Sequence, residues 1–249
     1  LGNDVATGDI TGDNSVDIVV ASDKKTRLSL YANSGDGSIF SQTEIDGGLN
    51  DAKSVFVVDV DGDGNNDVVS AATKSGKEKF YWYENSGAPA TDDDDDTSWG
   101  FTARTITAQY PTSVVFVDDD DFIEVVAVNI YVAKVDGDTK LDVLYADDTN
   151  GVLAWNAQGD LDSDPTDWGS SLLIDFDASN KAKWVVAADF DGDGDMDVVA
   201  AKTDGTIPMY ENSLAQSSSV TWTERTPLVN APADDDDIDI VASIEVADI

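Results

Sequence analysis

Asp59-Val-Asp-Gly-Asp-Gly-Asn-Asn-Asp67 is one of two nine-residue stretches with the same pattern, and the other is Asp189-Phe-Asp-Gly-Asp-Gly-Asp-Met-Asp197. Both have aspartate at positions 1, 3, 5 and 9 and glycine at positions 4 and 6. Four carboxylates so close in sequence repel one another strongly unless a cation lies among them. Calcium, a hard cation that takes about six to eight oxygen ligands, fits this set best. Glycine at position 6 allows the positive φ that lets the side chains converge.

The predicted calcium ligands are the side chains at positions 1, 3, 5 and 9 and the backbone carbonyl at position 7. In the two strong copies these residues are Asp59, Asp61, Asp63, Asn65 and Asp67, and Asp189, Asp191, Asp193, Asp195 and Asp197. An EF-hand is excluded, because it needs a glutamate at position 12 and a helix on each side. Position 12 is Ser70 or Ala200, and the flanking runs, such as Ser54–Val58, are β-branched and short. The predicted unit is strand, calcium loop, strand.

Two weaker copies of the loop occur in the chain. Asp9-Ile-Thr-Gly-Asp-Asn-Ser-Val-Asp17 has threonine at position 3 and Asn14, a residue that tolerates left-handed conformations, at position 6. We predict that it also binds calcium, and its ligands would be Asp9, Thr11, Asp13, Ser15 and Asp17. Lys134-Val-Asp-Gly-Asp-Thr-Lys-Leu-Asp142 begins with a lysine, whose ammonium can itself fill a cation site, and has Thr139 at position 6. We therefore expect no calcium in this copy.

A second signature follows each copy of the loop. It is a strand with an aromatic residue near its end and then an Asn/Ser turn, as in Trp82-Tyr-Glu-Asn-Ser-Gly87. A further strand comes next, as in Phe101–Ile106 and Trp222–Thr226. The copies start at residues 9, 59, 134 and 189, so successive starts are 50, 75 and 55 residues apart. A period near 50 with about four short strands is typical of a β-propeller blade.

On these motifs the chain resembles the FG-GAP/VCBS repeat proteins, whose blades carry an Asp-x-Asp-x-Asp-Gly-x-x-Asp calcium loop and whose best-known relative is the integrin α-subunit head. The resemblance covers most of the chain and is closest at residues 54–87 and 184–213. It implies an all-β fold, a β-propeller of four-stranded blades forming a single domain over residues 1–249. It also implies a role in adhesion or protein–protein assembly, in which calcium is structural.

The repeat breaks register in two places. Thr112–Val117 resembles the first strand of a blade, but a run of four aspartates follows it, and the next first strand, Ile130–Ala133, comes almost at once. The run Asp234–Asp239 repeats this irregularity. Blade openings near residues 9, 59, 118, 134, 189, 231 and 248 give about seven repeat units, some of them truncated. Seven complete blades would need about 350 residues. Either some blades are degenerate and collapsed, or segments are missing at 118–134 and 231–248. We favour the second interpretation, in which the chain is a fragment of a larger protein.

The composition favours an acidic, folded, extracellular module. The formal net charge is −37 and 41% of the residues are hydrophobic. So acidic a chain is unsuited to nucleic acid or to anionic membrane surfaces, and no apolar run is long enough for membrane insertion. Millimolar calcium outside cells suits loops of this type, so we predict an extracellular or cell-surface location. The expected partners are other extracellular proteins or copies of the chain itself, with glycans as a further candidate.

An enzyme is not expected, and no catalytic residue is assigned. The chain has neither histidine nor cysteine, which removes the commonest general base and the thiol nucleophile. No carboxylate pair stands out for glycoside hydrolysis, and the run Asp92–Asp96 is interpreted as a solvated loop rather than a second cation site. Two alternatives to the adhesion module are a structural subunit of a surface filament or sheath and a lectin-like, carbohydrate-binding propeller. The aromatic residues that could stack on sugars are better interpreted as packing between blades; they are Tyr81, Trp82, Tyr83, Trp99, Trp155, Trp168 and Trp222.

Overall fold

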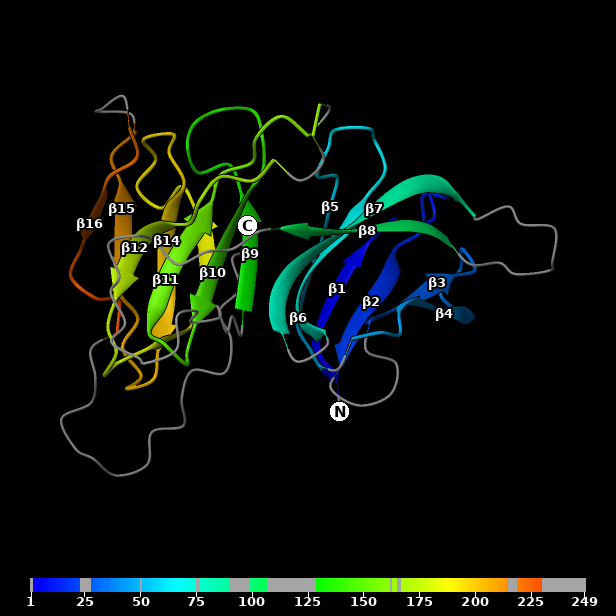
Figure 1. The fold of residues 1–249 in the computed structure, drawn as a ribbon, viewed down its shortest axis with the longest axis horizontal. Helices are drawn as coiled ribbons and strands as arrows, with labels where there is room; N and C mark the ends of the chain where they lie inside the picture. Colours follow the sequence, from blue (N-terminus) through cyan, green and yellow to red (C-terminus); the bar gives the residue numbers. More distant parts are fainter. Residues whose placement is uncertain are drawn as a thin grey trace. The chain divides into compact units, whose positions relative to one another are not determined.

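The computed structural model of the chain describes residues 2–22, 28–49, 51–74, 77–89, 99–106, 129–161, 163–164, 167–214 and 219–229. This part of the chain is all-β, with sixteen strands in four sheets of four strands each (Figure 1). Within each sheet the strands follow one another in chain order and all neighbours are antiparallel. Each sheet is therefore a four-stranded meander, the form predicted for a propeller blade.

The chain divides into two compact units, and the first comprises residues 1–107 and 160–167. Its first sheet consists of β1 (Gly2–Gly8), β2 (Asp17–Ser22), β3 (Leu28–Asn33) and β4 (Phe40–Asp46). Its second sheet consists of β5 (Asp51–Val58), β6 (Asp67–Lys74), β7 (Lys77–Pro89) and β8 (Trp99–Ile106).

The second unit comprises residues 108–159 and 168–249 and also holds two sheets. The third sheet consists of β9 (Asn129–Ala133), β10 (Asp142–Asp147), β11 (Val152–Asn156) and β12 (Leu172–Phe176). The fourth consists of β13 (Ala182–Ala188), β14 (Asp197–Lys202), β15 (Met209–Asn212) and β16 (Trp222–Glu224).

The predicted strand–loop–strand units are confirmed at all four aspartate loops. Residues 9–16 join β1 to β2, 59–66 join β5 to β6, 134–141 join β9 to β10, and 189–196 join β13 to β14. The predicted openings near residues 118, 231 and 248 lie outside the described residues. The number of blades and the single-domain organisation therefore stay predictions.

In the first unit, the period-two alternation of the strands directs aromatic side chains into a core between the two sheets. Tyr81 and Tyr83 on β7 belong to this core, together with Leu28 and Leu30 on β3 and Val55 on β5. The Tyr83 hydroxyl donates to Asp46 Oδ2 at 3.1 Å, so this buried phenol joins the second sheet to the first.

The second unit repeats this construction. Trp155 on β11, Val185 on β13 and Tyr210 on β15 share one buried cluster. The Tyr210 hydroxyl donates to Asp175 Oδ2 at 2.7 Å, and the Lys202 ammonium lies 2.8 Å from the same oxygen. In both units, therefore, a tyrosine of the later sheet donates to an aspartate on the last strand of the earlier sheet.

The first strands of neighbouring sheets are also joined in the same way in the two units. Asp4 Oδ2 on β1 accepts the backbone N–H of Val55 on β5 at 2.9 Å. Asn129 Oδ1 on β9 accepts the backbone N–H of Val185 on β13 at 2.8 Å. In each case a side chain of the neighbouring sheet supplies an acceptor for a backbone N–H of a buried residue, as buried donors require.

Candidate metal centre

The backbone of three of the four aspartate loops enters the left-handed region twice. Position 4 is glycine in all four loops, with φ between 71° and 81°. Position 6 also has positive φ in three loops, at Asn14 (65°), Gly64 (94°) and Gly194 (98°). Thr139, at the same position of the loop 134–142, does not, because a β-branched residue is strained there. The predicted requirement at position 6 is thus confirmed in three loops.

The carboxylate at position 1 closes both turns of each strong loop. Asp59 accepts the backbone N–H of Gly62 at 2.8 Å on Oδ1 and that of Gly64 at 3.0 Å on Oδ2. Asp189 makes the same pair of bonds at 2.7 Å and 3.1 Å. Each carboxylate oxygen keeps a second lone pair, so closing the turns is compatible with binding a cation.

The aspartate at position 9 is buried at the start of the following strand. Asp67 has no exposed surface, and it accepts the backbone N–H of Val60 at 3.0 Å and that of Asn85 at 2.7 Å. Asp197 is equally buried and accepts the N–H groups of Phe190 and Asn212 at 3.0 Å and 2.9 Å. This aspartate therefore links its loop to the third strand of its own sheet.

Three carboxylates converge in each strong loop, and all belong to the predicted ligands. One oxygen from each of Asp59, Asp61 and Asp67 lies within 4.8 Å of the others, and Asp189, Asp191 and Asp197 repeat the arrangement. The position-5 residues Asp63 and Asp193 are exposed and outside these groups. Their carboxylates accept the backbone N–H of position 7, at 2.7 Å and 3.0 Å. Their role as calcium ligands, like that of Asn65 and Asp195, stays a prediction.

The convergent carboxylates are in an unfavourable electrostatic setting. Burial raises the pKa of Asp67 to about 7, against the lowering effect of the backbone hydrogen bonds that it accepts. Burial also raises the pKa of Asp61 and of Asp197, and neighbouring carboxylates of each loop raise both pKa values further. A raised carboxyl pKa means that the negative charge is poorly stabilised. Each cluster therefore favours a bound proton or a bound cation.

The donor set fits a hard metal ion. All converging atoms are carboxylate oxygens, and none of the six clustered aspartates forms a salt bridge with a Lys or Arg of the described residues. A cation would stabilise carboxylates whose pKa values burial raises, and it would relieve the smaller contribution of carboxylate repulsion. Oxygen-only ligation selects magnesium, manganese or calcium over zinc or copper. These residues can thus hold a metal ion.

The loop 9–17 has the same backbone path but not the same convergence. Its carboxylates do not form a three-membered group of the kind found in the two strong loops. Asp9 accepts three backbone N–H groups within the loop, from Gly12, Asp13 and Asn14. The hydroxyl of Thr11, at position 3, is buried without a hydrogen-bond partner among the described residues. Calcium binding by this loop stays a prediction.

The loop 134–142 keeps only its later half. Lys134 at position 1 is exposed and supplies no acceptor for the turns. Asp142 at position 9 is fully buried and still accepts two backbone N–H groups, from Val135 at 2.8 Å and Gln158 at 3.1 Å. Burial raises its pKa to about 7. No three-carboxylate group is found in this loop.

Sequence reasoning treated the position-9 aspartate as a metal ligand and missed its second role. In all four loops it accepts the backbone N–H of position 2 and a second backbone N–H that lies 15 to 18 residues later in the chain. The retention of Asp142 in a loop that lacks its first carboxylate is the signal that could have shown this. The aspartate is a structural acceptor whether or not a cation is present.

Most of the tryptophans considered for stacking on sugars are withdrawn from solvent. Trp82, Trp155 and Trp168 are buried, and Trp222 is half-buried against the core of the second unit. This supports the interpretation that the repeated aromatic residues pack the sheets. The side chain of Trp99 and the run Asp92–Asp96 lie outside the described residues.

Comparison with known proteins identifies one family. The FG-GAP-like repeat matches residues 9–70 and 134–200, which together make up just over half of the chain. Each match begins at the first residue of an aspartate loop and ends in the first half of the next repeat, at β6 or β14. No curated protein matches the chain. In the part of the chain that the structure describes, no helix is long and apolar enough to cross a membrane.

Proposed function

The chain belongs to the FG-GAP-like repeat family, and we propose that it is a calcium-stabilised β-propeller module that binds other proteins outside the cell. Repeats of this family are generally interaction modules rather than enzymes. The observation that carries the proposal is the convergence of Asp59, Asp61 and Asp67, which recurs at the equivalent positions of the loop 189–197.

Calcium is the proposed ion because the loops offer many oxygens in an exposed turn. Magnesium demands near-ideal octahedral geometry and retains its water, whereas calcium accepts irregular sets of carboxylates and carbonyls. Bound calcium would neutralise buried negative charge on Asp67 and Asp197, and would hold the loop against the third strand through them. Its role is structural, because binding to the folded state alone stabilises that state.

A propeller is supported by the four meanders and by the packing of the first strand of one sheet against that of the next. Propeller blades pack face to face in this manner and leave loops and outer strands free for partners. The outer strand β12 exposes Leu172 and Phe176, with 48% and 42% of their surface accessible. Such side chains favour a protein partner over a glycan.

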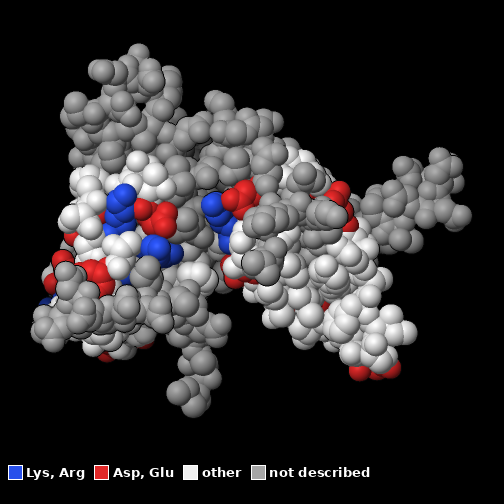
Figure 2. Space-filling model, turned by 90° about the horizontal axis from the view of Figure 1, so that it is seen from below, with Lys and Arg blue, Asp and Glu red and all other residues white. Residues whose placement is uncertain are grey.

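The charge distribution also favours a protein partner over nucleic acid. On the face seen in Figure 2, the Lys and Arg side chains that are described lie beside Asp and Glu side chains. Salt bridges such as Lys53–Asp51 and Lys202–Asp175 likewise pair a basic side chain with a carboxylate. A surface of this kind offers phosphates no positive stripe. Copies of the chain itself are partners that sedimentation at high calcium would reveal.

Thermal unfolding of the chain in calcium and in chelator tests the proposal. Each strong loop should add about 2.7 kcal/mol to the free energy of unfolding when calcium is at roughly 100 times its dissociation constant. Replacing the position-3 ligands, Asp61→Asn and Asp191→Asn, should remove most of this gain. The matched control is Asp136→Asn, the same change at position 3 of the loop 134–142. A melting temperature that does not respond to calcium would show that the proposal is wrong.

A further inference from the structure

Three of the aspartate loops have an aspartate at position 3 and a glycine at position 4. The pairs are Asp61–Gly62, Asp136–Gly137 and Asp191–Gly192. The aspartate is held in the same way in all three pairs, because its Oδ1 accepts the backbone N–H of position 5 at 3.0–3.1 Å. The glycine is exposed in all three. The pairs are therefore matched in sequence, in this hydrogen bond and in the exposure of the glycine.

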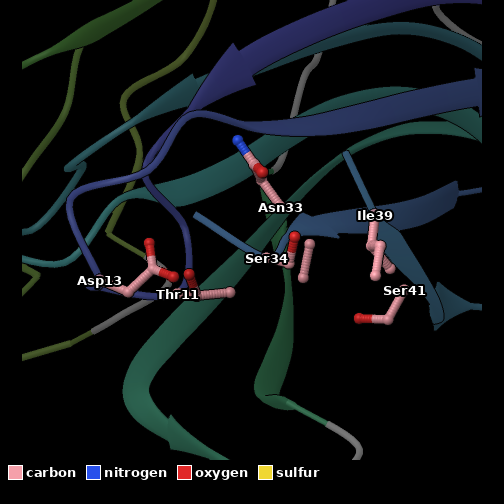
Figure 3. Close-up of a pocket in the computed structure, with 7 residues that line it drawn as sticks. Thr11, Asp13, Asn33, Ser34, Ile39 and Ser41 are labelled. Atoms are coloured by element: carbon pink, nitrogen blue, oxygen red, sulfur yellow. The ribbon is translucent and has the colours of Figure 1, made fainter. Parts of the chain in front are cut away.

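The backbone N–H of the glycine distinguishes one loop from the others. In the loops that begin with aspartate, the position-4 N–H donates to Oδ1 of that first aspartate at 2.7–2.8 Å; these donors are Gly12, Gly62 and Gly192. Figure 3 shows Thr11 and Asp13, between which Gly12 lies in the chain. The loop 134–142 begins with Lys134, and the N–H of Gly137 has no acceptor among the residues that the structure describes. Position 4 has φ between 71° and 81° in all four loops, so the difference is the missing acceptor and not the turn.

Other Asp–Gly pairs of the described chain are restrained as well. The glycine N–H donates at 2.9–3.1 Å in four further pairs, which end at Gly37, Gly64, Gly194 and Gly205. In Asp46–Gly47 the aspartate carboxylate accepts two donors, the Tyr83 hydroxyl at 3.1 Å and the N–H of Gly48 at 2.7 Å. Asp136–Gly137 differs from all of these, because within the described residues its carboxylate accepts one donor and its glycine N–H donates to none.

The fold requires glycine at residue 137. Its φ is 79°, a value that residues with a side chain rarely adopt, and an added Cβ atom would clash with the side chain of Leu214. A bulkier residue therefore cannot shield the preceding aspartate. Glycine is also the residue whose nitrogen is least hindered, because it carries no side chain.

We propose that Asp136–Gly137 is a site of spontaneous aspartate isomerisation, and that the position-1 carboxylate protects the equivalent pairs of the other loops. The Gly137 nitrogen bonds to Cγ of Asp136, while the hydroxyl of the protonated carboxyl group and the proton of the nitrogen leave as water. Water then opens the succinimide ring. If the bond between Cγ and nitrogen breaks, aspartate is restored. If the bond between the backbone carbonyl carbon and nitrogen breaks, isoaspartate forms, and the chain continues through the former side chain.

A hydrogen-bonded glycine N–H protects its pair for two reasons. The bond to the carboxylate must break before the nitrogen can approach Cγ, and the negative charge of the acceptor opposes loss of the proton. The reaction takes up and releases only water, so it needs no oxidant, reductant or cofactor. Isoaspartate would add one backbone carbon to the loop between β9 and β10. The inference goes beyond the proposed interaction role and concerns the loop in which no calcium is expected.

Incubation of the whole chain in water enriched in the heavy oxygen isotope tests the proposal, because each opening of the succinimide adds one solvent oxygen. The chain is kept at neutral pH in chelator and digested with pepsin. Mass spectrometry with electron-transfer fragmentation then locates the label and distinguishes isoaspartate from aspartate. Label is expected first at Asp136. Label that accumulates equally fast at Asp61 or Asp191 would overturn the proposal.

Two variants at the exposed residue Lys134 separate the missing acceptor from the lysine itself. Lys134→Asp returns an acceptor to position 1 and should slow the labelling of Asp136 by at least about ten-fold, because a hydrogen bond to a charged group must then be broken. Lys134→Ala removes the same lysine without supplying an acceptor, and its Asp136 should be labelled as fast as in the unchanged chain. Equal rates of labelling in the two variants would overturn the proposal.

The same incubation in guanidinium chloride shows whether the fold is the cause. All Asp–Gly pairs should then be labelled at comparable rates, because none keeps its hydrogen bonds. Label that still appears first at Asp136 would assign the difference to the local sequence and would overturn the proposal. So would a folded chain in which Asp136 stays unlabelled after the denatured chain has been labelled. Because every sample contains chelator, these results do not depend on calcium binding, and the melting response to calcium tests the proposed function separately.

Discussion

Asn85 on β7 donates its side-chain amide to the backbone carbonyl oxygen of Ile10, 75 residues earlier, at 2.8 Å. The same amide donates to the carbonyl of Asn66 at 2.9 Å, so it joins the aspartate loops of two neighbouring sheets. In the second unit, Asn212 donates to the carbonyl of Val135 at 2.9 Å in the same manner. Both asparagines are fully buried. Because the buried amide bonds to both loops, each loop helps to hold the other in place.

Asn85→Ala and Asn212→Ala are each expected to destabilise the chain by about 1–3 kcal/mol, because each leaves buried carbonyl groups without a donor. Chemical denaturation with urea measures the loss. Thr102→Ala, an exposed position on β8, is the control and should change stability by less than about 0.5 kcal/mol. Equal effects of Asn85→Ala and Thr102→Ala would contradict the bridging role.

Lys134→Asp combined with Thr139→Gly should create a further calcium loop. The two changes restore a carboxylate at position 1 and a residue that accepts positive φ at position 6, while Asp136, Asp138 and Asp142 are already present. Titration calorimetry should then detect one more calcium ion per chain than in the unchanged protein. Lys140→Asp, which adds a carboxylate to the same loop at position 7, is the control. An unchanged number of bound calcium ions would show that the residues at positions 1 and 6 are not what prevents the loop 134–142 from binding calcium.

Gly64→Ala should destabilise the chain by about 1–2 kcal/mol through backbone strain. Gly64 has φ of 94°, and a Cβ atom added there would meet no atom within 4 Å, so crowding cannot be the cause. Asn14→Gly at the equivalent position, with φ of 65°, removes strain and is expected to be neutral or stabilising. Thermal melts in chelator, which exclude effects on calcium, compare the two. Destabilisation by Asn14→Gly equal to that by Gly64→Ala would contradict the argument.

The stability of the third sheet should depend on pH through Asp142. Burial raises the pKa of this carboxyl to about 7 in the folded chain, whereas in the unfolded chain it is about 3.9. A carboxyl with a raised folded pKa contributes most stability below the unfolded pKa, and this contribution is lost as the pH rises through the folded pKa. The chain in chelator should therefore lose stability between about pH 4 and pH 7.

The variant Asp142→Asn isolates this effect, because an amide does not titrate in this range. Its stability deficit relative to the unchanged protein should shrink as the pH rises from about 4 to about 7, since only the carboxyl becomes charged. Urea unfolding at several pH values in chelator gives both curves. A deficit that is constant or that grows with pH would show that the buried carboxylate is well stabilised by its two backbone donors.

Much of the fold could be predicted because its signals are local. The strands around Asp59–Asp67 and Asp189–Asp197 follow from short β-branched runs, and the turns between them follow from glycine and aspartate at fixed positions. The family resemblance rested on the same residues and is confirmed by the match over residues 9–70 and 134–200. A motif whose conformation is set within nine residues can be recognised from those residues alone.

The candidate site was predicted less completely, because its ligands serve two purposes. The residues at positions 1, 3 and 9 of the strong loops do converge. What the pattern did not indicate is that Asp67 also accepts the backbone N–H of Asn85, 18 residues away. A hydrogen bond from a distant backbone N–H depends on no particular side chain, so it leaves no mark in the spacing of the aspartates.

The amino-acid sequence by itself determined the strand–loop–strand unit and the oxygen-rich chemistry of its loops, since both arise from residues that are neighbours in the chain. Only the tertiary structure decided that Asp142 is kept as a backbone acceptor in a loop without its first carboxylate, and that Asn85 bridges the loops of two neighbouring sheets. These features depend on which sheets and strands pack together. The two strong aspartate loops are therefore predicted cation sites, and their position-9 aspartates also hold each loop to its sheet through hydrogen bonds.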